Sequence, residues 1–359
     1  MENQPASQPP KRKPVASTMR TSRLRTTDPA RLARRKRLKD IQAIDVGTGK
    51  FRVAEQLFET LLDRVEAEIE GRCVVMIGRT GAGKTHIIRQ LIKRSDLQPI
   101  DEEEGLYRPL LLVTAPAPCT LRTLGSNILK ALTDEDPARS LKEYEVWERV
   151  RANFAAQRVA ILVIDEMHNV LTGRNTPERA KIAQTLKMLM VDRDNPMQIV
   201  IAGLPKLRDF VKNHRELHRR HHFIDLARLD PVKDSDKLEQ FLTGLEGCLG
   251  LKKGEFTNGA MPERFFAASR GLLGRVAFFA QEAAVIAASL NRPKEVVKFL
   301  ETAYERCYAC GKGANPFAMP NVRTLKIPKS ELELDEDEIT LLRGKKKVED
   351  DGDNDVSVF

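Results

Sequence analysis

The chain has 359 residues, of which 41% are hydrophobic, 5% aromatic and 31% charged, and its formal net charge is +9. This length allows two or three modest domains with a mostly aliphatic core. No run approaches the ~20 apolar residues of a membrane span, and the first residues show no apolar signal segment, so we expect neither membrane insertion nor secretion. The five cysteines are scattered and odd in number, which favours a reduced, cytoplasmic setting over a disulfide framework.

The charges are unevenly distributed along the chain. Residues 1–43 carry a net charge of +9, residues 330–359 carry −7, and the segment between them carries +7. Both ends have too little apolar surface to offset the entropy of ordering them. We therefore expect a disordered basic arm over residues 1–43 and a disordered acidic tail over residues 319–359. Within the arm, residues 31–39 (RLARRKRLK) are either a short helix or flexible, and they either contact phosphates or serve only solubility.

A phosphate-binding motif follows a predicted strand early in the chain. After a helix predicted over residues 51–69, residues 73–77 (CVVMI) are apolar and partly β-branched, as in a buried strand. Residues 86–93 have apolar side chains at helical spacing. Between this strand and this helix lie the eight residues of a G-x-x-x-x-G-K-[ST] motif, namely Gly78, Arg79, Thr80, Gly81, Ala82, Gly83, Lys84 and Thr85.

The residue types of this motif match the chemistry of binding ATP together with Mg²⁺. Its glycines let backbone N–H groups turn inward around phosphate oxygens, and the N-terminus of the following helix adds about half a positive charge. Lys84 is placed to reach the β- and γ-phosphates, and the Thr85 hydroxyl is placed to ligate Mg²⁺. We therefore expect ATP and Mg²⁺ as cofactors.

A second strong signal is a buried strand that ends in two carboxylates. Residues 159–164 (VAILVI) are apolar and precede Asp165 and Glu166. A strand of a parallel α/β sheet delivers the residues at its carboxyl end to the edge where ligands bind. We expect Asp165 to join Thr85 in holding Mg²⁺, and Glu166 to orient and deprotonate a water molecule as a general base. A general base at this position favours hydrolysis over phosphate transfer to a small molecule.

Strands and helices alternate through the first two thirds of the chain. Further strands are predicted over residues 109–114, 197–202 and 222–226, and helices over residues 121–132, 141–156, 176–191 and 205–211. This alternation predicts an α/β domain over residues 44–230, in which helices flank a parallel sheet on both faces. From residue 234 the pattern is wholly helical, which predicts a small all-α lid domain over residues 231–318.

Four features together resemble a known family. They are the compact size, residues 164–168 (IDEMH) after the strand, residues 199–207 (IVIAGLPKL), and residues 315–317 (NPF) after the last predicted lid helix. With the phosphate loop and the helical lid, these features resemble the P-loop NTPases of the AAA+ class. Within that class the chain resembles the TniB/TnsC transposition regulators, which are cousins of the Mu B target-capture ATPase. The resemblance covers about residues 40–318.

The resemblance implies two further arginines in the site. In this class an arginine near the end of the sheet reaches the nucleotide of a neighbouring subunit, and Arg219 or Arg220 occupies the matching place, unless this segment is only a basic surface turn. Arg275, at the start of a lid helix, matches a second arginine. The chain departs from the class at residues 202–204 (AGL), where a polar residue usually touches the γ-phosphate. Hydrolysis is therefore either slow or served by another group.

The resemblance also implies a function. Members of this family form ATP-dependent rings or filaments around duplex DNA and contact its backbone. This implies DNA contacts for Arg122, Lys130 and Lys142, unless these are only solvated side chains. The implied protein is a bacterial, cytoplasmic, DNA-associated homo-oligomer that links a target-selecting adaptor protein to the transposase and disassembles on ATP hydrolysis. Three alternatives stay open: a replication initiator or helicase loader of the same fold, a small-molecule kinase, and a nucleotide-dependent DNA scaffold that does not hydrolyse ATP.

Overall fold

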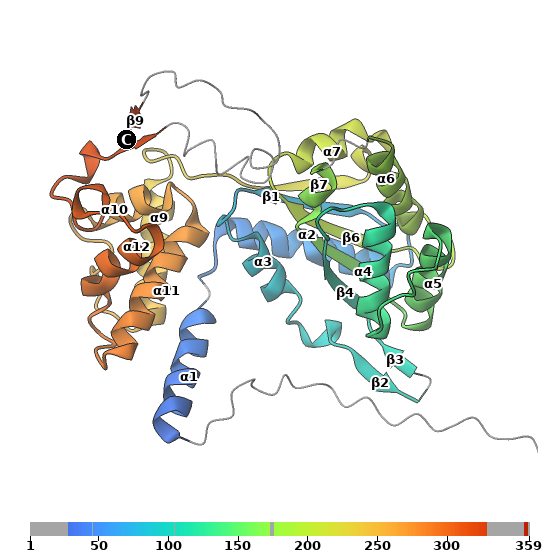
Figure 1. The fold of residues 1–359 in the computed structure, drawn as a ribbon, viewed down its shortest axis with the longest axis horizontal. Helices are drawn as coiled ribbons and strands as arrows, with labels where there is room; N and C mark the ends of the chain where they lie inside the picture. The colour runs from blue at the N-terminus through green and yellow to red at the C-terminus, as the bar shows by residue number, and fades with distance from the viewer. Residues whose placement is uncertain (1–27, 45, 104, 173–175, 329–354, 358–359) are drawn as a thin grey trace, which may run out of the picture.

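The structure, a computed structural model, describes residues 28–44, 46–103, 105–172, 176–328 and 355–357. It contains a sheet domain and a bundle of helices beside it (Figure 1). The disorder expected for residues 1–27 and for most of the acidic tail concerns residues outside this described part of the chain.

A five-stranded parallel sheet forms the centre of the first domain. Its strands are β1 (Cys73–Gly78), β4 (Leu110–Thr114), β5 (Ile161–Asp165), β6 (Gln198–Gly203) and β7 (His221–Leu226). Their order in the sheet is β4-β5-β6-β1-β7, and every neighbouring pair is parallel. The carboxyl ends of all five strands, among them Gly78, Asp165 and Gly203, therefore lie at one edge of the sheet.

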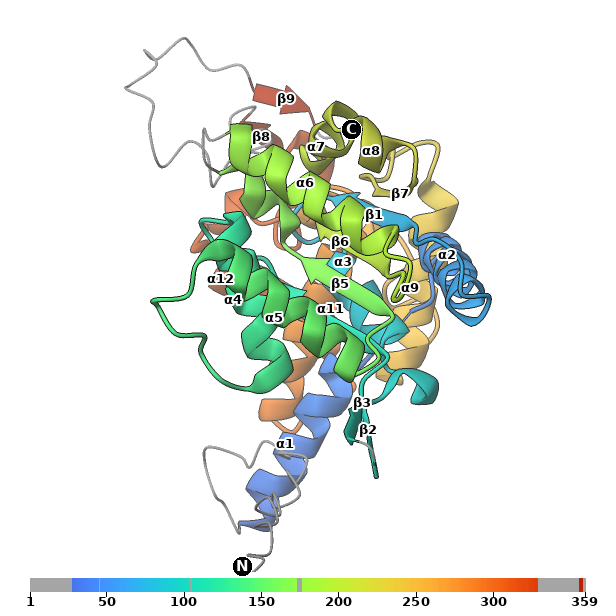
Figure 2. The same ribbon diagram turned by 90° about the vertical axis from the view of Figure 1, so that its right-hand side faces the viewer.

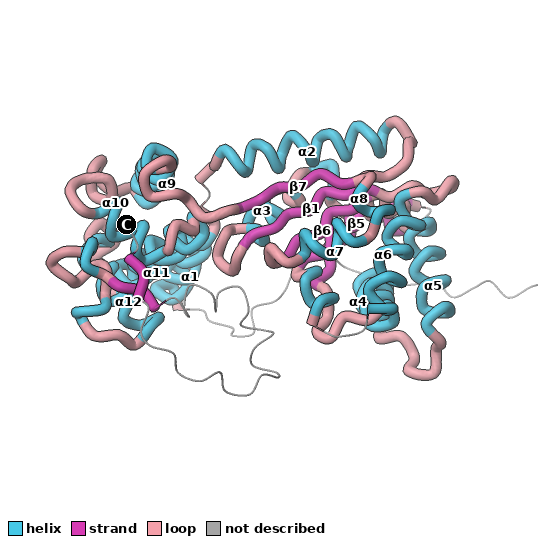
Figure 3. Tube along the Cα trace, turned by 90° about the horizontal axis from the view of Figure 1, so that it is seen from above, coloured by secondary structure: helices cyan, strands magenta, loops and turns pink. Residues whose placement is uncertain are grey.

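Helices cover both faces of this sheet, as the continuous apolar run of β1 predicts. The helices of this domain are α2 (Gly49–Glu66), α3 (Lys84–Leu91), α4 (Leu121–Thr133), α5 (Glu143–Ala156), α6 (Thr176–Met190), α7 (Leu207–Asn213) and α8 (Arg215–His218), with 3₁₀ turns at Ser95–Leu97 and Met167–Leu171. Val74 and Met76 of β1 share a core with α2 and α3, whereas Val75 and Ile77 share a core with α4 to α7, because successive side chains of a strand point to opposite faces. Figure 2 shows α4, α5 and α6 across one face, and Figure 3 shows α2 along the other.

The helical lid follows the sheet domain and has a core of its own. Its elements are α9 (Ser235–Leu249), α10 (Met261–Ser269), α11 (Leu273–Ser289), the 3₁₀ turn Val296–Phe299 and α12 (Leu300–Tyr308). Phe241, Phe265 and Phe279 are among its buried side chains. The first described helix, α1 (Pro29–Gln42), contacts α11 and adds Ile41 to this core.

Some short elements differ from the expectations or were not expected. After α3, β2 (Ile100–Glu102) and β3 (Gly105–Tyr107) pair as a small antiparallel hairpin that the sequence patterns do not predict. Of the two alternatives for residues 31–39, the structure has the helix. The acidic tail begins later than residue 319, because Met319, Val322 and Leu325 are buried with Ala267 of α10.

The remaining elements close the described chain. They are the 3₁₀ turns Lys312–Ala314 and Val322–Thr324 and the antiparallel pair β8 (Lys326–Pro328) and β9 (Asp355–Ser357). Within the described ranges, no helix taken singly has the length and apolar composition to cross a membrane, and α10 and α11 meet that criterion only as a pair bent by 110°.

Candidate nucleotide-binding site

The phosphate loop connects the end of β1 to the start of α3, as the motif predicts. Gly81 and Gly83 have φ angles of +83° and +100°, in the left-handed region that glycine adopts without steric cost. A Cβ at Gly83 would meet nothing within 4 Å, so this side of the loop has room for an anion. The unbonded N–H groups and the dipole at the start of α3 favour a phosphate there.

Lys84 is held by hydrogen bonds to the first two residues of the loop. Its ammonium Nζ donates to the carbonyl oxygens of Gly78 at 2.6 Å and Arg79 at 3.1 Å, and the residue is only 7% exposed. Burial lowers the pKa of Lys84, and the carboxylates of Glu166 and Asp165 partly offset this effect. A phosphate in the loop would supply negative charge that stabilises this buried ammonium.

Thr85 and Asp165 fit the expected Mg²⁺ site. The Thr85 hydroxyl donates to Oδ2 of Asp165 at 2.8 Å, although the two residues come from different elements of the fold. Neighbouring ligands of an octahedral Mg²⁺, each about 2.1 Å from the ion, are about 3.0 Å apart, so these two oxygens are spaced nearly as such ligands are. Among the described residues, no group of three or more His, Cys, Asp or Glu side chains could hold a metal. A site built from one hydroxyl and one carboxylate leaves its other positions to phosphates and water, as Mg²⁺ prefers.

Glu166 lies one residue beyond the end of β5. Its φ angle is +55°, and its N–H donates to Oδ1 of Asp165 at 2.8 Å, so the chain turns sharply at this residue. Burial and the charge of Asp165 raise the pKa of Glu166, and Lys84 acts in the opposite direction. A carboxylate of raised basicity beside the expected metal ligands is suited to accept a proton from water.

His168 lies against the carboxyl end of β6, where this chain lacks the polar residue that usually touches the γ-phosphate. A Cβ at Gly203, the last residue of β6, would come within 3.0 Å of the backbone nitrogen of His168 and 3.2 Å of its Cβ. The residue is 6% exposed, and its Nε2 lies 3.5 Å from Oε2 of Glu166. Within the described part of the chain, neither ring nitrogen has a hydrogen-bond partner.

The imidazole of His168 is uncharged at physiological pH. Burial and the charge of Lys84 lower its pKa to about 4, against a smaller raising effect of Asp165. Sequence reasoning did not single out this residue, although it is the last letter of the IDEMH segment. The sequence does not reveal the position of this ring, because it depends on the 3₁₀ turn after β5, which brings the ring back beside Glu166.

The lid contacts the phosphate loop through the start of α11. A Cβ at Gly274 would lie 2.3 Å from the carbonyl oxygen of Gly81 and 2.9 Å from the amide nitrogen of Gly83. A Cβ at Gly81 would lie 2.7 Å from Cγ of Arg275. The side chain of Arg275 therefore lies over the phosphate loop, which is where the resemblance implies a lid arginine.

Arg219 and Arg220 lie at the opposite edge of the sheet from the phosphate loop. They precede His221, which starts β7 and pairs with Cys73 at the start of β1. The length of a strand, about 20 Å for six residues, separates them from the loop of their own chain. The Arg220 guanidinium is bound to Glu70 at 2.9 Å, whereas the Arg219 side chain is exposed and has no ion pair with any described residue. Of these two arginines, Arg219 is therefore the one whose side chain is available to another molecule.

The three residues expected to contact DNA lie around the loop between α4 and α5. Arg122 donates to two backbone carbonyl oxygens of this loop. Lys130 forms an ion pair with Asp136 at 2.7 Å, and Lys142 is exposed immediately before α5. Their contacts with DNA stay predictions.

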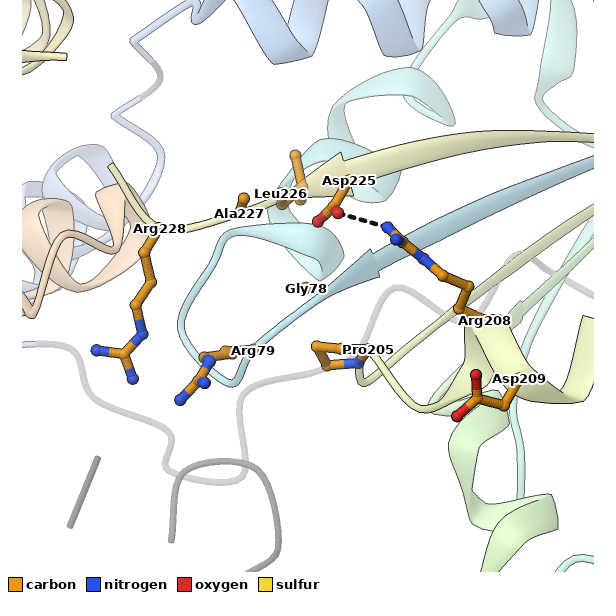
Figure 4. Close-up of a pocket in the computed structure, with 9 residues that line it drawn as sticks. All are labelled: Gly78, Arg79, Pro205, Arg208, Asp209, Asp225, Leu226, Ala227 and Arg228. Carbon is orange, nitrogen blue, oxygen red and sulfur yellow. Dashed lines mark hydrogen bonds and ion pairs between the residues drawn. The ribbon is translucent and has the colours of Figure 1, made fainter. Parts of the chain in front are cut away.

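A cavity of about 490 Å³ opens beside the start of the phosphate loop, next to the carboxyl end of β7. The side chains of Arg79 and Arg228 extend in the same direction along it, and Arg208 is paired with Asp225 at 2.5 Å on its wall (Figure 4). This volume lies in the range of small-molecule sites. Its arginines favour the anionic part of a ligand such as a nucleotide.

The fold and this site together define the class of the protein. A parallel sheet, a phosphate loop bonded to the carboxylate of a neighbouring strand and a helical lid over the loop are the features of a P-loop NTPase of the AAA+ class. Solved structures with this fold include the Aeropyrum pernix ORC1 protein in complex with DNA, with a TM-score of 0.56, 16% identity, and coverage of 88% of this chain and 83% of that chain. Cdc6p from Pyrobaculum aerophilum has a TM-score of 0.52, 13% identity, and coverage of 85% and 84%. At such identities the likeness concerns the fold alone.

The chain belongs to the TniB family. The family model described as Bacterial TniB protein matches residues 41–231, which is more than half of the chain. No curated protein matches the sequence. The match confirms the resemblance that the sequence motifs indicate.

Proposed function

We propose that this TniB-family protein is an ATP-hydrolysing regulator of DNA transposition that assembles on duplex DNA. The observation that carries this proposal is the division of the catalytic groups between the two edges of the sheet. Lys84, Asp165, Glu166 and Arg275 gather at the carboxyl edge, whereas Arg219 is exposed at the opposite edge. A bound nucleotide would therefore meet Arg219 only when a second copy of the chain lies beside the first.

Each group has a separate task in the proposed hydrolysis. The N–H groups of the phosphate loop and Lys84 hold the β- and γ-phosphates in a fixed orientation. Glu166 accepts a proton from the water that attacks the γ-phosphorus. Arg275 from the lid and Arg219 from a neighbouring copy stabilise the charge that develops on the transferring phosphoryl group. Mg²⁺ at the Thr85 and Asp165 oxygens would neutralise further phosphate charge.

Duplex DNA is the proposed surface for assembly. The segment between the charged ends carries a net charge of +7, which favours contacts with the phosphate backbone of any sequence. Family membership supports this role, and one solved structure of the same fold is an ORC1 protein in complex with DNA. The assembled protein would recruit a target-selecting adaptor and the transposase, and ATP hydrolysis would dissolve it.

Nucleotide-dependent binding of the full chain to a labelled DNA duplex tests the proposal. Lys84→Ala removes the ammonium from the phosphate loop, so DNA binding that depends on ATP is expected to be lost. Lys93→Ala, at an exposed position two residues beyond α3, is the matched control and is expected to bind like the unmodified chain. Equal ATP-dependent binding by the Lys84 variant would contradict the mechanism.

Glu166→Gln separates binding from hydrolysis, because it keeps the shape of the side chain and removes the base. It is expected to bind ATP and DNA, to release phosphate at least about 10²-fold more slowly, and to stay assembled. Phosphate release is measured without any acceptor molecule. An unmodified chain that assembles with ATP but releases no phosphate would instead be a non-hydrolysing scaffold, and release that requires a small acceptor would indicate a kinase.

A replication initiator or helicase loader is the second candidate, since structures of ORC1 and Cdc6p share the fold. The family match favours the transposition role. The partner that stimulates phosphate release distinguishes the two. Stimulation by a transposase supports the first role, and stimulation by a replicative helicase alone supports the second.

A further inference from the structure

We propose that α1 is a DNA-binding element: a basic helix, anchored to the lid, that lies in the major groove of duplex DNA and contacts the phosphates of both strands. The inference rests on the proposed binding to duplex DNA and assigns a surface to it.

The helix carries positive charge around its whole circumference. Its basic residues are Arg31, Arg34, Arg35, Lys36, Arg37 and Lys39, and all six are exposed. Four of these residues are consecutive, so their side chains leave the helix about 100° apart and point in all directions. Only one acidic residue, Asp40, lies within the helix, and none lies in its first turn.

Among the residues that the structure describes, these charges have almost no counter-charge. Arg31 lies 3.7 Å from Asp28, but the other five basic side chains form no ion pair with any described residue. Arg31 and Arg35, and likewise Arg35 and Lys39, are four residues apart, a spacing at which like charges destabilise a helix. A helix of 14 residues is also close to the length at which isolated helices are marginal in water. A polyanion alongside α1 would remove this repulsion and stabilise the helix.

The C-terminal end of α1 is fixed to the lid. Ile41 is 9% exposed and belongs to the lid core. Shortly after the helix, Val46 lies against α9, where a Cβ at Gly244 would be 2.5 Å from Cγ1 of Val46. In contrast, residues 31–37 are all exposed, and α1 extends away from the rest of the lid (Figures 1 and 2). The basic part of the helix is therefore held in a defined position with its sides free.

The dimensions and the charge distribution of this free part fit a groove better than a flat surface. From Pro29 to Lys39 the helix is about 16 Å long at ~1.5 Å per residue, and the major groove of B-DNA, about 12 Å wide, admits an α-helix. A helix in that groove faces phosphates on both sides, which accounts for basic residues around the whole circumference. A flat anionic surface would require them on one side only.

The lid links this helix to the nucleotide site. The start of α11 lies on the phosphate loop at Gly274, and α1 contacts the same helix α11. A change in the position of the lid on the loop would therefore move α1 relative to the sheet. The position of the basic helix relative to the sheet is therefore coupled to whether ATP occupies the phosphate loop.

The salt dependence of DNA binding tests the inference, with a random-sequence duplex as the probe and full-length chains throughout. The variant Arg34→Gln/Arg35→Gln/Arg37→Gln removes three charges, retains good helix formers and leaves Ile41 in place. The control Lys252→Gln/Lys253→Gln/Lys294→Gln removes three exposed charges elsewhere on the lid. ATP binding by both variants, measured separately, confirms that they are folded.

A plot of log K against log salt concentration has a negative slope, with about −0.9 for each phosphate contact. If each of the three arginines contacts one phosphate, the magnitude of this slope decreases by about 2.7 in the variant. The control is expected to leave the slope unchanged. If the magnitude of the slope decreases no more in the α1 variant than in the control, the inference is overturned. The basic helix would then serve a protein partner or solubility. Failure of the unmodified chain to bind the duplex at all overturns the proposed function, and the role of α1 with it.

Discussion

Arg219 and the phosphate loop lie at opposite edges of one sheet, and this separation leads to a prediction for mixed assemblies. Arg219→Ala keeps its own ATP site but offers no arginine to a neighbour, whereas Glu166→Gln offers the arginine but lacks the base. Alone, the Arg219 variant is expected to release phosphate at least about 10³-fold more slowly than the unmodified chain, and the Glu166 variant at least about 10²-fold more slowly. A mixture of the two is expected to recover part of the rate, because the Glu166 variant completes the site of the Arg219 variant.

The control for this experiment is Arg215→Ala, an exposed arginine in the same segment, which is expected to retain the rate of the unmodified chain. Steady-state phosphate release in the presence of duplex DNA is the measurement. If both variants bind DNA and their mixture is no faster than either alone, Arg219 does not act on a neighbouring site.

His168 is expected to hold Glu166 in the orientation that hydrolysis requires, since its ring lies 3.5 Å from that carboxylate. Replacement by leucine fills a similar volume without a polar atom, and is expected to lower kcat by up to about 10²-fold with little change in the affinity for ATP. His168→Gln retains a donor and is expected to keep more of the rate. Equal kcat values for the leucine variant and the unmodified chain would show that the ring only fills space.

At the scale of elements, the contact between α11 and the phosphate loop depends on Gly274. Gly274→Ala would place a Cβ 2.3 Å from the Gly81 carbonyl oxygen, so the lid must shift away from the loop. We expect ATP affinity to fall about tenfold or more, from an overpacking cost of ~1–3 kcal/mol. Titration with a fluorescent ATP analogue measures this change.

The matched control is Gly247→Ala in α9, where a Cβ would meet nothing within 4 Å. This change is expected to leave ATP affinity unaltered, because an alanine in a helix interior is tolerated or mildly stabilising. Equal ATP affinities for the Gly274 and Gly247 variants would mean that the lid does not need to approach the loop for ATP to bind.

The burial of β1 leads to a prediction for cysteine chemistry. Burial raises the pKa values of both Cys73, at the start of β1, and Cys119 to about 12. Since the thiolate is the reactive form, both thiols are expected to resist iodoacetamide at about pH 8 in the folded protein. Cys248 is exposed and is expected to react. Peptide mass spectrometry measures the labelling of each cysteine. Equally fast labelling of Cys73 and Cys248 would contradict the position of β1 in the sheet.

Local patterns predict most elements of this fold but not all of them. The apolar run of β1 and the helical spacing of α4 and α5 are visible in a short window of sequence. The strands β2 and β3 are three residues long, and no alternation marks them. The helix α1 is marginal by itself, and its anchor, Ile41, is buried by lid residues far away in the sequence, so no local pattern could decide between helix and flexible arm.

At the scale of the whole molecule, the sequence predicts the parts of the site that lie in short motifs. The loop around Lys84 and the carboxylates after β5 are such parts, because their chemistry fixes their spacing. The contact of Arg275 with Gly81 joins two domains, and the sequence implies it only through the family resemblance. The isolation of Arg219 from its own loop follows from the parallel pairing of β1 and β7, because Arg219 precedes β7 whereas the loop follows β1.

Assembly on duplex DNA in the presence of ATP is the central claim, and negative-stain electron microscopy of the purified full chain tests it most directly. Specimens with and without duplex DNA are compared in the presence of ATP, ADP or a non-hydrolysable ATP analogue. We predict rings or filaments only when DNA is combined with ATP or the analogue, and none for Lys84→Ala. Monomers under every condition would contradict the claim.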